Sequence, residues 1–322
     1  MMIKSAKVAL AATIAAVAFP GLAAAEYPEK EVELVIPFGP GGATDVLFRL
    51  ISAEAEEHLG ESIVPVNMAG AGATRGSRAV KDADPDGYTI LGSHDTIALS
   101  NLAGMVDYSY DAFEPVILLT QTINIVSAGD DPVVSSAADI ADYAAENPGE
   151  LAISMIPSST DHFFWASFFT ETGIDMSDIR FIGYPDTGEQ VSAVIAGDID
   201  FALFNMPSGG SQFAAGTLTP LAVGAEERLG ALPDTPTLKQ EGIDLTTATS
   251  RGVFVPKGTP AEVIEKIADA YEAALQNETL VSRIENEFGS IVNIKRGEEY
   301  LEFLEQNEAT LTKAAESMEF SR

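Results

Sequence analysis

The chain has 322 residues, with 49 acidic and 18 basic side chains and a formal net charge of −31 at pH 7. Its length suggests about two domains, and its composition, 46% hydrophobic and 21% charged, is typical of a folded globular protein. The absence of cysteine excludes disulfides, thiolate metal ligands and a cysteine nucleophile. The acidic excess argues against binding to nucleic acid or to anionic lipid.

The first 25 residues have the pattern of a secretory signal peptide. Lys4 and Lys7 precede an apolar, alanine-rich run from Val8 to Phe19, and Ala23 to Ala25 provide the small residues of a cleavage site. We expect cleavage after Ala25 and export of the remaining chain to the periplasm; an uncleaved N-terminal anchor is the alternative. No later apolar run approaches the ~20 residues that a membrane helix needs.

Beyond this segment, short apolar runs alternate with amphipathic ones, which predicts an α/β fold. The expected strands are Glu31–Phe38, Ser62–Val66, Tyr88–Gly92, Val116–Leu119, Ile123–Ala128, Leu151–Met155, Arg180–Gly183, Phe201–Phe204, Leu218–Val223 and Gly252–Val255. The expected helices are Thr44–Leu59, Ser136–Asn147, His162–Thr172, Glu189–Ala196, Pro260–Gln276, Glu278–Phe288 and Glu298–Met318, so that the C-terminal third is expected to be helical.

The most informative segment is PFGPGGATD at 37–45, which joins the first strand to the first helix. Backbone N–H groups at a helix start have no intrahelical partners and lie at the positive end of the helix dipole. Glycines let a ligand approach these groups closely, so the segment is suited to bind a carboxylate. The alternative is a plain turn in which Thr44 or Asp45 caps the helix. For Asp45 the cap is favoured, because its charge would repel an anion.

Three later turns also place glycines or hydroxyls near a helix start. They are Gly70–Gly76, which contains Arg75, then Gly92–Thr96 and Pro157–His162. An arginine can bind a carboxylate through two parallel hydrogen bonds, although at a helix start it is more often solvated. Hydroxyls at a helix start are more often caps than anion ligands.

The sequence gives little support to catalysis. Ser93, His94 and Asp95 are the residue types of a hydrolase triad, but three consecutive residues cannot form its chain of hydrogen bonds. No G-x-S-x-G motif is present, and the histidines lack zinc-motif spacing. A metal site formed across a cleft by His94-Asp95 and Asp161-His162 is the remaining alternative. We expect no enzymatic activity, no metal and no cofactor.

Several short motifs occur in a fixed order along the chain, none of them diagnostic alone. They are PFGPGGATD at 37–45, VN at 66–67 before the 70–76 turn, PDGYT at 85–89, GDIDF at 197–201, NMPS at 205–208, LPDTPT at 232–237 and VPKGTP at 255–260. With these motifs the chain, from Tyr27 to about Met318, resembles the solute receptors of tripartite tricarboxylate transporters, the Bug family of periplasmic binding proteins.

The resemblance implies a type II-like periplasmic binding protein with two α/β lobes joined by two crossover segments. Residues 26–124 and 250–322 would form lobe one, and residues 125–249 lobe two. The implied ligand is an organic carboxylate: a di- or tricarboxylate, an acidic amino acid or an aromatic acid. The receptor, a monomer, would deliver it to the membrane permease subunits. Carried over by position, the ligand contacts would be Phe38, Gly39, Gly41, Gly42, Asp45, Ser93, Thr96, Ser159, Thr160, His162, Thr187 and Asn205.

Two departures from the family pattern leave the identity of the ligand open. Ser250-Arg251-Gly252 stands where an aromatic pair often precedes the glycine, and Asp161 stands where a small hydroxyl residue is usual. We expect Arg251 near the cleft, either binding the ligand carboxylate or pairing with Asp161 or Asp186. Two other functions remain possible from the sequence: a receptor that presents its ligand to a sensor kinase, and a secreted hydrolase.

Overall fold

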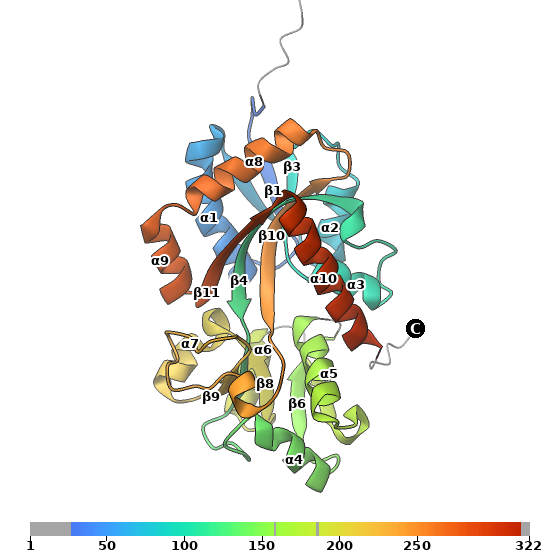
Figure 1. Ribbon diagram of the computed structural model, residues 1–322, viewed down its shortest axis with the longest axis vertical. Helices are drawn as coiled ribbons and strands as arrows, with labels where there is room; N and C mark the ends of the chain where they lie inside the picture. Colours follow the sequence, from blue (N-terminus) through green and yellow to red (C-terminus); the bar gives the residue numbers. More distant parts are fainter. Residues whose placement is uncertain (1–26, 158, 185–186, 317–322) are drawn as a thin grey trace, which may run out of the picture.

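The computed structural model describes residues 27–157, 159–184 and 187–316, so the expected signal peptide lies outside the described residues. The chain forms two lobes stacked along the long axis of the molecule (Figure 1). Lobe one contains a six-stranded sheet and lobe two a five-stranded sheet. This confirms the expected fold class of two α/β lobes joined by crossover segments.

The sheet of lobe one is mixed. Its strand order is β11-β4-β10-β3-β1-β2; β1 runs parallel to β2 and β3, whereas β10 is antiparallel to β3 and β4, and β11 is antiparallel to β4. The strands are β1 (Val32–Ile36), β2 (Ile63–Asn67), β3 (Thr89–Ser93), β4 (Phe113–Ile123), β10 (Ala248–Pro256) and β11 (Ser290–Arg296).

Strand β1 shows why this sheet is covered on both faces. Val32, Leu34 and Ile36 join the core formed with α1, α8 and α9, whereas Val35 joins the core formed with α2, α3 and α10. Because successive side chains of a strand point to opposite faces, a nearly continuous apolar run requires helices on both. The helices are α1 (Ala43–Leu59), α2 (Thr74–Lys81), α3 (Thr96–Leu102), α8 (Ala261–Ala274), α9 (Glu278–Asn286) and α10 (Gly297–Ala315).

Lobe two has the strand order β7-β6-β8-β5-β9, with β6 parallel to β7 and β8. Its core contains an aromatic cluster on α5, in which Trp165, Phe168 and Phe169 are completely buried. The strands are β5 (Ile125–Ala128), β6 (Ala152–Met155), β7 (Arg180–Gly183), β8 (Phe201–Phe204) and β9 (Thr219–Val223). The helices are α4 (Ala138–Glu146), α5 (Thr160–Thr172), α6 (Thr187–Ile195) and α7 (Met206–Ala215).

Two extended stretches connect the lobes (Figure 1). Strand β4 ends in the sheet of lobe one, and after the single residue Asn124 the chain enters the sheet of lobe two as β5. Strand β10 brings the chain back. On this basis we propose lobe boundaries near residues 124 and 250. Helix α10 adds a contact between the lobes, because its Ala314 packs in one cluster with Phe163 and Ala166 of α5.

The expectation of an entirely helical C-terminal third is wrong, because β11 separates α9 from α10. This strand lies at the edge of its sheet, and its structure depends on pairing with the distant β4. Helix α7 was also not expected. Helix α7 contains Pro207, Gly209 and Gly210, and a capping box between Asn205 and Ser208 stabilises its start. Among the described helices, none has the length and apolar character needed to cross a bilayer.

Candidate functional site

The loop after β1 leads directly into the first turn of α1. Gly42 is the N-cap residue, and no side chain accepts a hydrogen bond there from the N–H groups that follow. Gly41 has a φ of +82°, a conformation that favours glycine. The first-turn N–H groups of α1 are therefore available to an anion.

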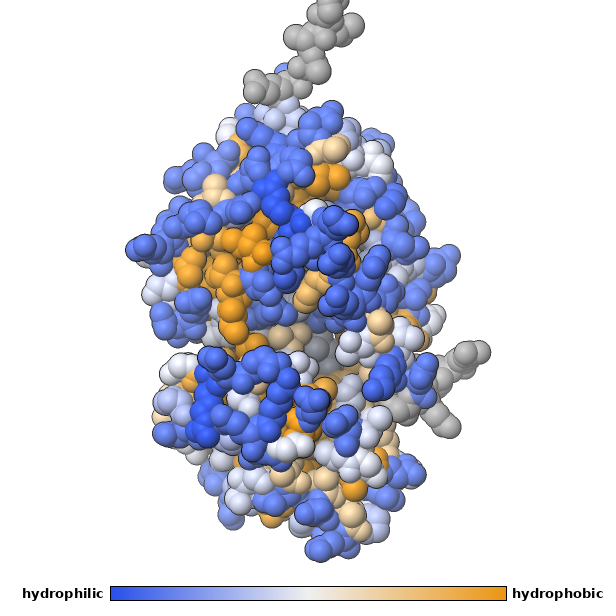
Figure 2. Space-filling view, in the orientation of Figure 1, coloured by the Kyte–Doolittle hydropathy of each residue, from blue (hydrophilic) through white to orange (hydrophobic). Residues whose placement is uncertain are grey.

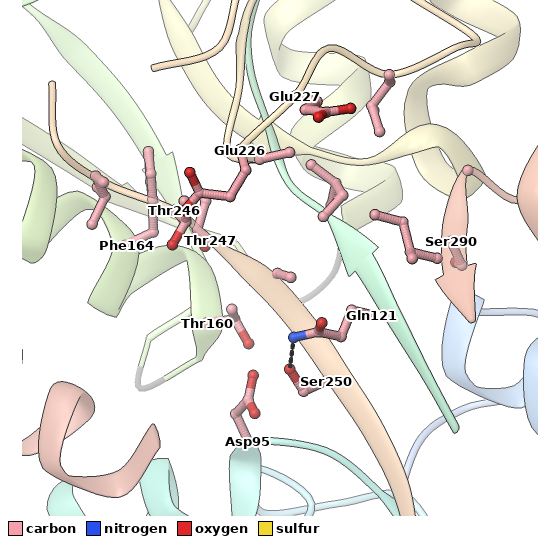
Figure 3. A pocket seen from close by; sticks show the side chains of 18 of the residues that line it. Asp95, Gln121, Thr160, Phe164, Glu226, Glu227, Thr246, Thr247, Ser250 and Ser290 are labelled. Atoms are coloured by element: carbon pink, nitrogen blue, oxygen red, sulfur yellow. Dashed lines mark hydrogen bonds between the residues drawn. The ribbon is translucent and has the colours of Figure 1, made fainter. Parts of the chain in front are cut away.

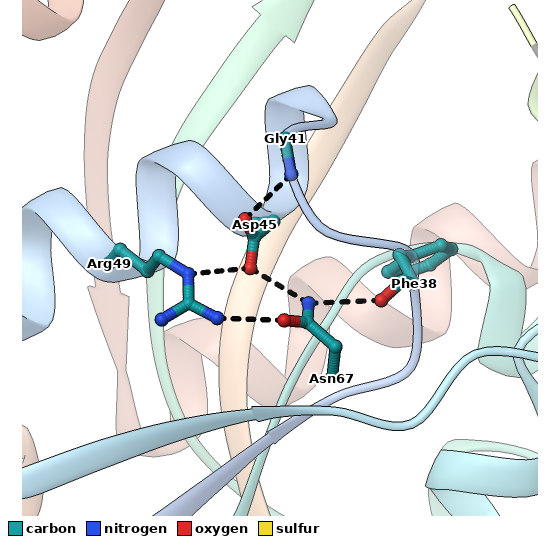
Figure 4. Close-up of polar contacts among 5 residues, drawn as sticks. All are labelled: Phe38, Gly41, Asp45, Arg49 and Asn67. Carbon is teal, nitrogen blue, oxygen red and sulfur yellow. Dashed lines mark hydrogen bonds and ion pairs between the residues drawn. The ribbon is translucent and has the colours of Figure 1, made fainter.

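A polar network holds this loop in place (Figure 4). The buried carboxylate of Asp45 accepts hydrogen bonds from the Gly41 N–H at 2.8 Å, from Arg49 Nε at 2.8 Å and from Asn67 Nδ2 at 2.8 Å. Asn67 Nδ2 also donates to the carbonyl oxygen of Phe38 at 3.0 Å. Burial alone would raise the pKa of Asp45, but the donors from Gly41, Asn67 and Arg49 hold it below its usual value. Asp45 thus stabilises the loop, and one of the loop N–H groups is occupied by it.

The turn between β3 and α3 adds buried polar groups. The Ser93 Oγ, His94 Nδ1 and Thr96 Oγ1 atoms are buried and have no hydrogen-bond partner among the described residues. The His94 ring stacks on Phe38, with centroids 4.6 Å apart and planes 8° from parallel, so this turn lies beside the first loop. Because a buried polar group without a partner is costly, unpaired groups gathered at one place indicate a ligand site.

Arg251 of β10 lies at the same place. Its Nε donates to Thr44 Oγ1 at 3.0 Å, and its Nη1 donates to Thr122 Oγ1 at 2.5 Å and to the Thr249 carbonyl at 3.3 Å. Burial lowers the pKa of Arg251 to about 10, so the guanidinium remains charged at neutral pH. Arg251 forms no ion pair with a described carboxylate. The alternative pairing with Asp186 falls outside the described residues.

In lobe two, Ser159, Thr160 and His162 lie at the start of α5, after β6. Asp161 organises this turn: its carboxylate accepts hydrogen bonds from the Ile156 N–H, the His162 N–H, Gln190 Nε2 and Ser159 Oγ. Asp161 is therefore engaged within lobe two and does not pair with Arg251. Burial lowers the pKa of His162 to about 4, which favours its neutral form.

Thr187 begins α6 after β7, and Asn205 is the N-cap of α7 after β8. Asn205 Oδ1 accepts a hydrogen bond from the Ser208 N–H at 3.2 Å, so Asn205 stabilises the helix start. The three parallel strands of lobe two thus end in turns that carry the five candidate residues of this lobe. Ligands of α/β proteins commonly bind in the crevice at the carboxyl ends of such strands.

A groove of about 940 Å³ separates the lobes, and Asp95 and Thr160 line it from either side (Figure 3). Figure 2 shows the surface hollowed between the lobes. Gln121 and Ser250 also line the groove, with Gln121 Nε2 donating to Ser250 Oγ at 3.1 Å. Because successive side chains of β10 point to opposite faces, Ser250 faces this groove whereas Arg251 faces α1. The first loop and the groove therefore lie on opposite faces of the crossover strands.

The structure brings the lobe-one candidates together with residues that were not among the expected ligand contacts. His94, Asp95 and Thr122 lie beside the expected Ser93, Thr96 and Arg251. The position of His94 and Asp95 in the 92–96 turn could have indicated these two residues from the sequence. Thr122 lies inside a strand, and no pattern in the sequence indicates it. Within the described part of the chain, no group of three or more His, Cys, Asp or Glu residues is arranged to hold a metal ion.

Comparisons with known proteins agree with this architecture. The family described as "Tripartite tricarboxylate transporter family receptor" matches residues 47–313. Protein BugT of Bordetella pertussis is 29% identical over 267 residues, covering 79% of each chain. The structure of Rhodopseudomonas palustris MatC with bound malate matches with a TM-score of 0.78 and 25% identity, covering 90% of this chain and 100% of that one. The R. palustris Rpa4515 structure with adipate matches with a TM-score of 0.80 and 29% identity, covering 91% and 98%.

Proposed function

The chain belongs to the family of tripartite tricarboxylate transporter receptors, and we propose that it captures an organic carboxylate between its lobes and delivers it to the membrane permease subunits of such a transporter. The family consists of substrate-binding receptors and not of catalysts, in agreement with the absence of a nucleophile elbow from the sequence. Relatives bound to malate and to adipate support a small dicarboxylate as ligand.

One observation carries this proposal: the open N–H groups at the start of α1 lie beside buried polar atoms that lack partners. Gly42 leaves the helix start uncapped by a side chain, and Ser93 Oγ, His94 Nδ1 and Thr96 Oγ1 have no described partner. A carboxylate accepts up to four hydrogen bonds through its two oxygens. It is thus the kind of ligand that satisfies several of these groups at once.

Closure of the lobes would complete the site. Thr160 and Thr187 stand at helix starts in lobe two, where α5 follows β6 and α6 follows β7. In this mechanism the acid binds first to lobe one, and the turns of lobe two then close over it. A ligand can favour the closed state only by the amount by which it binds that state more tightly.

A thermal-shift screen of organic acids tests the proposal. The panel contains malate, adipate, citrate, aspartate and benzoate, with acetamide as an uncharged control. A ligand present at about 100 times its Kd stabilises the folded state by about 2.7 kcal/mol, which raises the melting temperature by several degrees in a protein of this size. If none of the acids raises the melting temperature, carboxylate capture is excluded for this panel and the proposal fails.

The cellular setting is part of the same proposal. We infer export to the periplasm with cleavage after Ala25, and action as a monomer. N-terminal sequencing of the secreted protein tests the cleavage site, and light scattering tests the oligomeric state. Co-purification with the two membrane subunits of a tripartite transporter tests delivery to the permease.

A further inference from the structure

Arg251 is a buried cation whose hydrogen-bond partners are all neutral. Only 4% of its surface is exposed. Its three hydrogen bonds go to the hydroxyls of Thr44 and Thr122 and to the carbonyl of Thr249. A guanidinium carries five N–H donors, and Nη2 has no acceptor among the described residues.

The positive charge of Arg251 lies next to the loop that follows β1. Thr44, its Nε partner, is the second residue of α1, so the guanidinium lies at the helix start whose N–H groups are open. A carboxylate on the N–H groups of Ala43 and Thr44 would lie beside the residue whose hydroxyl accepts the hydrogen bond from Arg251. Two independent features of the structure therefore point to the same anion: a helix start without a side-chain cap, and a guanidinium whose Nη2 has no acceptor among the described residues.

The groups around Arg251 compensate its charge only in part. From the turn between β3 and α3, Asp95 attracts it and the neutral His94 lies nearby. Asp95 itself is held by Asn307 Nδ2 of α10 at 2.9 Å. The neighbouring strand β4 contributes the hydroxyls of Thr120, which is paired in register with Arg251, and of Thr122.

We propose that Arg251 determines the specificity of this receptor, because its Nη2 donors bind the carboxylate that the N–H groups of α1 hold and thereby restrict the site to ionised acids. This inference rests on the proposed function and names the charge that selects the ligand. It also implies that Arg251 lowers the stability of the ligand-free protein, since a buried charge without an ionic partner is destabilising. Arg251 thus stabilises the complex more than it stabilises the empty receptor.

The test compares Arg251→Met with Arg283→Met. Both variants lose one positive charge, but Arg283 lies on α9, is paired with Glu287 and is about half exposed. Calorimetry measures the affinity for the acid that gives the largest thermal shift, with adipate and malate as the first probes, and for the uncharged diamide of the same acid. Thermal melting of the ligand-free proteins measures stability.

We expect Arg251→Met to bind the acid about 10- to 100-fold more weakly, as for the loss of hydrogen bonds to a charged group. Its preference for the acid over the diamide falls by the same factor, while its ligand-free melting temperature is no lower than that of the wild type. Arg283→Met binds like the wild type. If the methionine variant does not fold, Arg251→Gln, which retains an amide donor for Thr122, serves for the same comparison.

Two results would overturn the inference. If Arg251→Met or Arg251→Gln binds the acid within twofold of the wild type, Arg251 does not contact the ligand, and the proposed function stands without it. If the variant loses affinity for acid and diamide equally and melts several degrees lower, Arg251 is only a structural residue. If no acid binds even the wild type, the proposed function itself fails.

Discussion

Phe38 and His94 stack face to face, with ring centroids 4.6 Å apart, and so join the loop after β1 to the turn after β3. The stack covers one face of the imidazole, and His94 is buried with a lone Nδ1 that has no described partner. Burial, with a further contribution from the nearby Arg251, holds the pKa of His94 well below its usual value. The candidate site is thus a place where a histidine stays neutral beside a cation.

The first prediction concerns this histidine. We expect the His94 ring to remain neutral from pH 6.5 to pH 8, because protonation would add a second buried positive charge beside Arg251. NMR of ring-labelled histidine should show no titration midpoint for His94 in this interval. In Arg251→Met the pKa of His94 should rise, since one cause of its depression is removed. A midpoint near 6.5 in the wild type would show that His94 is accessible to water.

The second prediction uses the glycines of the first loop. A Cβ at Gly39 would meet nothing within 4 Å, and at Gly42 it would meet only the Gly39 carbonyl oxygen at 3.9 Å. Alanine at either position should therefore change the free energy of unfolding by less than about 1 kcal/mol. If a ligand approaches the backbone here, the same substitutions should weaken its binding by about tenfold or more.

Gly41→Ala is the control for Gly39→Ala and Gly42→Ala, because at this position alanine is expected to lower stability through backbone strain. The φ of Gly41 is +82°, so alanine should cost about 1–2 kcal/mol of stability. Chemical denaturation and calorimetry on the three variants separate the two effects. Unchanged ligand affinity in both Gly39→Ala and Gly42→Ala would place the ligand elsewhere.

The third prediction concerns Asp45. Asp45→Ala leaves the N–H of Gly41, Asn67 Nδ2 and Arg49 Nε without their acceptor. Loss of hydrogen bonds to a charged group should lower the free energy of unfolding by about 2–3 kcal/mol, less any compensation by water at the half-exposed Arg49. Urea denaturation measures this loss. Ligand affinity should also fall, because the loop N–H groups lose their fixed orientation.

The sign of the pH effect at Asp45 follows from its lowered pKa. Its contribution to stability is present above the pKa of the unfolded chain and is lost as the pH falls through the folded value. Acid should therefore remove the stability difference between the wild type and Asp45→Ala. A difference that persists at the lowest pH would mean that the side chain acts through packing and not through its charge.

The fourth prediction concerns Asp95, for which the sign is opposite. Burial is the main cause that raises the pKa of Asp95 to about 6, against opposing contributions from Asn307, the Ser250 N–H and Arg251. Since the folded state binds this proton more tightly, the contribution of Asp95 to stability is fully present below about pH 4 and is lost as the pH rises through about 6. Two pKa units correspond to about 3 kcal/mol.

Asp95→Asn cannot ionise and should lack this pH dependence. Denaturation at pH 4, 5.5 and 7 should show the variant gaining about 2 kcal/mol relative to the wild type between the lowest and the highest pH. A constant difference between the two proteins would show that Asp95 titrates near its ordinary value.

The fifth prediction concerns the rate of ligand binding. The formal net charge of −31 repels an anionic ligand at long range, whereas the dipoles and the cation at the first loop act only at short range. Added salt screens the repulsion, so the association rate constant of a dicarboxylate should rise with ionic strength. Stopped-flow measurements from low to high salt test this, and slower association at high salt would contradict it.

Features that depend on neighbouring residues could be read from the sequence. The buried strand 32–36 and the glycine loop before α1 are local patterns, because alternation, apolar runs and helix starts depend on residues a few positions apart. Strand β11 and helix α7 were missed because their stability comes from elsewhere: β11 needs the edge of β4, and the glycine-rich α7 needs the capping box of Asn205.

The chemistry of the candidate site divides in the same way. The amino-acid sequence alone determined an acidic α/β chain with a glycine-rich loop before a helix, a place suited to an anion. Only the tertiary structure decided that Arg251, 207 residues from Thr44, lies at that helix start. It also decided that the carboxylates of Asp161 and Asp45 accept hydrogen bonds from groups of the protein itself. The physical reason is that backbone dipoles follow from local conformation, whereas the pairing of buried charges depends on segments that only folding brings into contact.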